Sequence, residues 1–78
     1  MLIIASKRKL EIGSKYKGLA RGPWYEPEPN QCYKVIATGT EEKWINCLVN
    51  YHGEDERGYL EMLAAIGGPW FYYEIQTD

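Results

Sequence analysis

The residues that could do acid–base or metal chemistry are few: the chain has 78 residues, with one histidine and two cysteines. A hydrolase needs a nucleophile, a base and an orienting group within reach of one another. His52 ends an alternating apolar segment that also contains Cys47. In an extended strand, residues five apart point to opposite faces, so these two side chains are not expected to meet. We therefore expect no catalytic residue and a protein that is not an enzyme.

A zinc site would have to combine Cys32 and Cys47 with His52 and a carboxylate. The chain has no C-x-x-C pair, and this spacing matches no zinc pattern. The acidic run at residues 54–56 lacks the alternating oxygen ligands of a calcium loop. The glycines form no phosphate-binding motif. We expect free thiols, no metal and no cofactor.

Charge is unevenly distributed along the chain, although the net charge is only −2. Residues 1–25 contain six cations and one acid, whereas residues 26–78 contain ten acids and three cations. One reading of this pattern is an ordinary solvated surface. The other is two faces of opposite sign, one of which suits a polyanion or an acidic partner.

The basic N-terminal third could bind nucleic acid. Its candidate contacts are Lys7, Arg8, Lys9, Lys15 and Lys17. The aromatic residues Tyr16, Trp24 and Tyr25 lie among or near them, and small barrels hold single strands with this mixture of cations and rings. The isoelectric point near 5.4 is low for such a domain. Nucleic-acid binding is therefore the alternative hypothesis.

Protein–protein docking is the leading hypothesis from the sequence, because Trp, Tyr and Arg are the usual interface anchors. The prolines of "PWYEPEP" (residues 23–29) would limit the entropy lost when this segment binds. The candidate contacts are Arg21, Trp24, Tyr25, Glu54, Asp55 and Glu56. The competing reading is structural, with Trp24 and Tyr25 covering the core. The protein would be a small adaptor or inhibitor, and an acidic face imitating nucleic acid would suit a bacteriophage inhibitor.

The expected elements are mostly short strands. The pattern predicts a strand over residues 10–18 that bends at Gly13, a proline-rich loop over 19–31, a strand over 32–38, a hairpin connection over 39–43, a strand over 44–51 and a polar turn over 52–57. In the 44–51 strand, Ile45, Cys47 and Val49 would share the core face, and Trp44 and Leu48 would point away from it.

The C-terminal part mixes two periodicities. We expect a short strand near residues 57–60, then one helical turn over about 60–66 that ends before Gly67. Residues 69–76 form a terminal strand with Phe71, Tyr73 and Ile75 on one face. The tripeptide GPW occurs at residues 22 and 68, but its flanks differ, so we interpret it as shared turn chemistry and not as a repeat.

These elements predict a mainly β protein, a single domain over residues 1–78 with a small, strongly bent antiparallel sheet. The succession "IGSKYKG", "QCYKVIATG", "WINCLVNYHG" and "RGYLEML" over residues 10–66 resembles small SH3-like barrel domains of unknown function from bacteria and phages. The resemblance implies a partly closed barrel and no particular activity.

The N-terminal segment "MLIIA" contains only five apolar residues, and the basic residues follow it. This order and length fit neither a signal peptide nor a membrane span. We expect a cytoplasmic protein that does not enter a membrane. The aromatic segment at residues 70–75 could pair between two copies, so a homodimer stays open.

Overall fold

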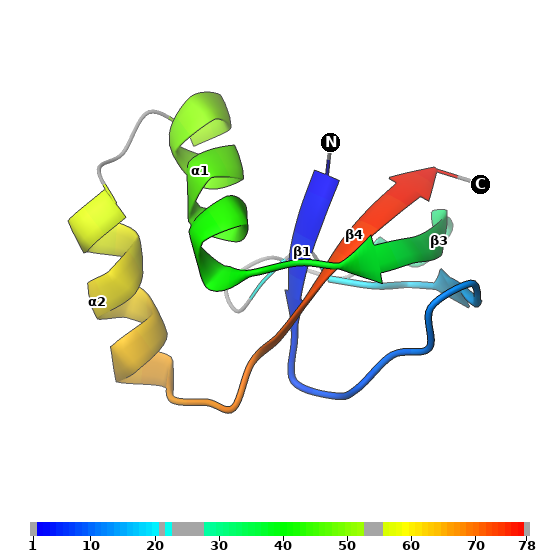
Figure 1. Cartoon of the computed structure of the whole chain (residues 1–78), viewed down its shortest axis with the longest axis horizontal. Coiled ribbons are helices and arrows are strands. Elements are labelled where there is room, and N and C mark those ends of the chain that lie inside the picture. The colour runs from blue at the N-terminus through cyan, green and yellow to red at the C-terminus, as the bar shows by residue number, and fades with distance from the viewer. Residues whose placement is uncertain (1, 21, 23–27, 53–55, 78) are drawn as a thin grey trace.

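The computed structural model describes residues 2–20, 22, 28–52 and 56–77, and it contains one four-stranded antiparallel sheet and two helices (Figure 1). The strands are β1 (Leu2–Ser6), β2 (Lys15–Lys17), β3 (Cys32–Thr38) and β4 (Phe71–Thr77). The helices are α1 (Glu41–His52) and α2 (Glu56–Ile66). The strand order β1-β4-β3-β2 places the first and last strands of the chain side by side in the sheet.

The sheet separates two hydrophobic clusters. The helix-side cluster contains Ile3, Ala5, Trp44, Ile45, Leu48, Tyr59 and Leu63. The loop-side cluster contains Ile4, Leu10, Leu19, Tyr33, Val35, Tyr73 and Ile75. Neighbouring residues of β1 point into different clusters, as alternation in a strand requires. Helix α1 packs on β1, and α2 lies beside α1 (Figure 1).

Helix α1 replaces the hairpin connection and strand that we expected over residues 39–51, so that prediction is wrong. The buried side chains Trp44, Ile45 and Leu48 lie at helical spacing and form one apolar stripe. Thr40 caps the helix, since its Oγ1 accepts a hydrogen bond from the Lys43 backbone N–H at 3.2 Å. Two glutamates in the first turn suit the positive end of the helix dipole. The apolar residues of this segment fit the period of a helix as well as that of a strand, and the Thr40 cap favours the helix.

Helix α2 is longer than the helical turn that we expected over residues 60–66. The short strand predicted near residues 57–60 is wrong, because the helix already begins at Glu56. Tyr59 and Leu63, four residues apart, supply its buried face. The predicted end is confirmed: Gly67 has φ 82°, and its N–H donates to the Leu63 carbonyl at 3.0 Å.

Three of the strand predictions are confirmed in full or in part. Strand β3 has the predicted bounds, and β4 lies within two residues of them. Phe71, Tyr73 and Ile75 share the loop-side face of β4, as alternation predicted. The strand expected over residues 10–18 is reduced to the three residues of β2. Gly13 forms the predicted bend, with φ 91°.

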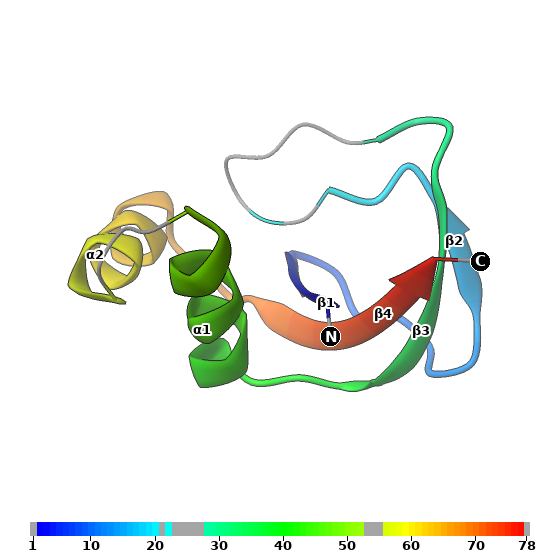
Figure 2. The ribbon, with the colours of Figure 1, turned by 90° about the horizontal axis from the view of Figure 1, so that it is seen from above.

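The sheet is open, with β1 and β2 at its edges, and the partly closed SH3-like barrel is not confirmed. Figure 2 shows the strong curvature of β3 and β4. A register shift between Val35 and Ala37 in β3 contributes to this bend, because an extra residue increases local twist. Within the part of the chain that the structure describes, neither helix is long and apolar enough to span a membrane.

Candidate functional site

Three consecutive cations, each lying over a different aromatic ring, form the most distinctive surface feature of the described residues. Lys7 Nζ lies 5.3 Å from the centre of the Trp70 ring. Arg8 Cζ lies 5.6 Å from that of Tyr16, and Lys9 Nζ lies 5.8 Å from that of Phe71. All three distances fall within the roughly 6 Å reach of a cation–π interaction. We call these six residues the basic–aromatic cluster.

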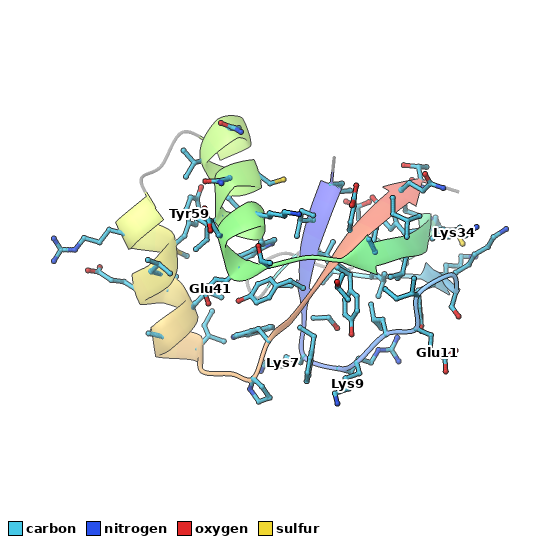
Figure 3. All side chains as sticks on the ribbon, viewed as in Figure 1. Lys7, Lys9, Glu11, Lys34, Glu41 and Tyr59 are labelled. Atoms are coloured by element: carbon cyan, nitrogen blue, oxygen red, sulfur yellow. The ribbon has the colours of Figure 1, made fainter. Side chains whose placement is uncertain are left out.

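The pairing of β1 with β4 brings the two halves of this cluster together. Ser6, the last residue of β1, pairs with Phe71, the first residue of β4. The chain therefore leaves the sheet at Lys7 at the same end where it enters through Trp70. Figure 3 places Lys7 and Lys9 together at this end of the molecule. The cluster thus depends on a contact between residues more than sixty positions apart in the sequence.

The Ser6 hydroxyl shapes the turn that carries the cations. Its Oγ donates to the Arg8 carbonyl at 2.8 Å and accepts from the Arg8 N–H at 3.2 Å. Such a local side-chain-to-backbone turn is typical of serine. The turn carries the chain past the first residue of β4, Phe71, which pairs with Ser6. Lys7 consequently lies over Trp70, which packs on the helix-side cluster, whereas Lys9 lies over Phe71, which packs on the loop-side cluster.

Two tyrosine hydroxyls hold the chain immediately after the turn. The Tyr73 hydroxyl accepts a hydrogen bond from the Leu10 N–H at 2.8 Å, and this contact is buried. The Tyr16 hydroxyl accepts from the Glu11 N–H, also at 2.8 Å. A buried backbone N–H needs such a partner because its water has been removed. The two phenols therefore fix the position of the basic turn relative to the sheet.

We predict that Tyr73→Phe destabilises the protein by about 1–3 kcal/mol, because it leaves the buried Leu10 N–H without an acceptor. Urea unfolding followed by circular dichroism measures this loss. The matched control is Tyr16→Phe, which removes the acceptor of the Glu11 N–H. Because Glu11 is exposed, water can accept that hydrogen bond instead, and we expect this variant to lose less stability than Tyr73→Phe. Equal stability of Tyr73→Phe and the unmodified protein would show that the hydroxyl does not support this segment.

Strand β2 adds two lysines next to the cluster, and alternation places both on the face of the strand opposite Tyr16. Lys15 and Lys17 are exposed and flank Tyr16, the residue that lies under Arg8. Lys15 is also directly opposite Lys34 of β3. The structure therefore brings all five cations of the nucleic-acid hypothesis into two neighbouring segments, 7–9 and 15–17.

One acidic contact lies on the helix side. The Tyr72 hydroxyl donates to Glu41 Oε2 at 3.4 Å, which links β4 to the start of α1. Burial raises the pKa of Tyr72 to about 12, and the charge of Glu41 and its hydrogen bond act in the same direction. Tyr72 therefore stays protonated at neutral pH, and its hydroxyl serves as a structural donor.

The residues predicted for protein docking fall mainly outside the described part of the chain. This applies to Arg21, Trp24, Tyr25, Glu54 and Asp55. Glu56 is described only as the first residue of α2. The docking hypothesis therefore stays a prediction.

The residues considered for metal or nucleophilic chemistry lie on different elements. Cys32 is in β3 and Cys47 is in α1; both are half-buried, and neither is in a disulfide bond. His52 is the last residue of α1. No group of three or more histidine, cysteine or acidic residues that could hold a metal ion occurs among the described residues.

Sequence reasoning identified the cations of the cluster but missed two of their ring partners, Trp70 and Phe71. We assigned both only to the terminal strand. The available indication was the short continuous apolar run directly before Lys7, which is compatible with a strand buried on both faces. Choosing β4 as the partner of that strand requires the sheet order, which local patterns do not contain.

Comparison of the chain with protein-family models, with curated proteins and with solved structures found no match. The resemblance to SH3-like barrels stays a prediction.

Proposed function

We propose that this protein binds nucleic acid through the basic–aromatic cluster and the adjoining lysines of β2. The observation that carries the proposal is the placement of three consecutive cations over three separate rings within 6 Å. Lysine and arginine neutralise phosphates and release their counterions, which drives association. Aromatic rings beside them suit a ligand that has both phosphates and bases.

The exposure of the cations supports this assignment. Lys7, Arg8 and Lys9 are all exposed, while their ring partners are half-buried and pack against the two core clusters. An exposed cation–π contact is worth only about 0.5–1 kcal/mol. The cations can therefore leave the rings for phosphates at a small cost, and the site needs no large rearrangement.

The negative net charge of the chain does not oppose a local site. Several acids lie on the helices, among them Glu41, Glu42 and Glu61. Exposed charges farther apart than about 10 Å are largely screened at 0.1 M salt. Near the cluster, residues 7–17 contain five cations and one acid, Glu11, so the local charge is positive. The acids of the helices repel a polyanion, so they favour its approach from the side of the molecule away from the helices.

Binding of a fluorescein-labelled 12-nucleotide thymidylate strand, followed by anisotropy between 50 and 300 mM salt, tests the proposal. We expect affinity to fall steeply with salt, by roughly 0.7 in logarithmic slope for each phosphate contact. Three to five contacts give a slope of roughly −2 to −3.5. Absence of binding at 50 mM salt, or binding that does not change with salt, would overturn the assignment.

A further inference from the structure

Trp70 has a buried polar group without a partner. Its indole Nε1 is shielded from solvent and finds no hydrogen-bond acceptor among the described residues. A buried donor that lacks an acceptor carries a desolvation cost, and tryptophan N–H groups usually find a partner when they are buried. The observed position of the indole is therefore not its most favourable one, and an incoming acceptor would stabilise a shifted ring.

The surroundings of Trp70 allow such a shift. The ring is half-buried and precedes β4, so no sheet hydrogen bond of that strand fixes its backbone. Gly67 and Gly68 come directly before Pro69 and Trp70, and a Cβ placed at Gly68 would lie 3.5 Å from Trp70 Cδ1. The indole edge thus lies against a residue without a side chain. The face of the ring is covered by the flexible, exposed side chain of Lys7.

The other two rings of the cluster are more firmly held. Tyr16 belongs to β2, and its hydroxyl is already bonded to the Glu11 N–H. Phe71 is the first residue of β4 and packs on the loop-side cluster. Both can support a cation, but among the described residues Trp70 Nε1 is the buried side-chain polar atom that lacks a partner. This difference singles out Trp70 within the cluster.

We infer that Trp70 is a base-stacking residue and that the ligand is a single-stranded nucleic acid. The inference rests on the proposed function and adds to it. On binding, an unpaired base replaces Lys7 on the indole face, and the Lys7 ammonium moves to the adjacent phosphate. The indole N–H then gains an acceptor from the nucleotide. A polyanion without bases, or a duplex whose bases are already stacked, can use the cations but not the ring.

The test combines two ligands with two proteins. The ligands are the 12-nucleotide thymidylate strand and a strand of twelve abasic sites with the same phosphates. The proteins are the unmodified chain and Trp70→Leu, which keeps an apolar side chain but removes the ring. We expect Trp70→Leu to weaken binding of the thymidylate strand roughly 5- to 150-fold, the value of one stacked base. Binding of the abasic strand should change less than twofold. Trp70→Phe should recover part of the lost affinity.

The indole N–H resonance of Trp70 in a ¹H–¹⁵N spectrum gives a second readout, assigned by its absence in Trp70→Leu. It should move much further on addition of the thymidylate strand than with the abasic strand, whose phosphates can draw Lys7 off the ring but which has no base to stack on it. Equal binding of both strands by the unmodified protein would overturn the stacking role and leave the electrostatic proposal intact. An equal loss on both strands in Trp70→Leu would show a structural role only. Absence of binding to either strand would instead overturn the proposed function.

Discussion

Replacing Lys7, Arg8 and Lys9 together by glutamine is expected to weaken binding of the 12-nucleotide strand on the order of 100-fold at 50 mM salt. Each cation that contacts a phosphate contributes roughly 0.7 to the logarithmic salt slope for a single strand. Loss of three contacts should therefore reduce the steepness of that slope by about 2. Anisotropy titrations at several salt concentrations measure both quantities.

The control for this variant must have the same net charge, because a more negative protein repels nucleic acid everywhere on its surface. The triple variant carries −5, compared with −2 for the unmodified chain. Lys43→Gln, Arg57→Gln and Asn46→Asp together also give −5 and change only exposed helix positions. The Arg57–Glu61 ion pair lost in the control is largely exposed and worth little. We expect the control to bind within about threefold of the unmodified protein.

The comparison of these two variants separates a local site from a general charge effect. If both weaken binding equally, the basic–aromatic cluster is not the contact surface. A weakened triple variant with an unchanged salt slope would show that residues 7–9 act through folding and do not contact phosphates. Matching circular dichroism spectra of the three proteins exclude that cause directly.

The strands were predictable where alternation and turn residues agree. Strand β3 was predicted with its bounds, and the face of β4 that contains Tyr73 and Ile75 was also correct. Both strands are rich in β-branched and aromatic residues and begin after proline-containing segments. The end of α2 was predictable for a similar reason, since Gly67 is a residue type that favours the φ 82° found there.

The helix α1 was not predicted because its sequence supports two periods at once. Ile45, Cys47 and Val49 alternate as in a strand, while Trp44, Ile45 and Leu48 form a helical stripe. Thr40 and the two glutamates that follow it distinguish the helix from the strand, because this sequence is typical of a helix N-terminus. Giving that cap more weight than β-propensity would have corrected the assignment.

Only part of the basic–aromatic cluster was predictable, because its three cations are adjacent in the sequence whereas two of its rings, Trp70 and Phe71, lie far from them in the sequence. Lys7, Arg8 and Lys9 were selected from charge alone. Their contacts with Trp70 and Phe71 depend on the pairing of the first strand with the last. Pairing of strands that far apart is set by the whole sheet, because every strand must find a neighbour and bury one face. Local sequence rules do not contain that information.

Trp44→Ala is expected to destabilise the protein by about 3–5 kcal/mol, the largest effect that we predict for one substitution. Trp44 has no exposed surface, and its ring centre lies 5.9 Å from that of Tyr72. A domain of 78 residues has a total stability of roughly 4–12 kcal/mol. The variant should therefore show a much lower urea midpoint or unfold entirely at 37 °C, as measured by circular dichroism.

The same substitution distinguishes the helix from the strand that the sequence favoured. In the strand, Trp44 would point away from the core, and its loss would cost little. In the helix, it contributes to the helix-side cluster together with Ile45 and Leu48. Leu60→Ala is the matched control, because Leu60 is a large apolar residue of α2 that is 38% exposed. We expect that control to lose less than about 1 kcal/mol, since little apolar surface leaves the core. Similar losses in the two variants would contradict the assignment of Trp44 to the centre of this small interior.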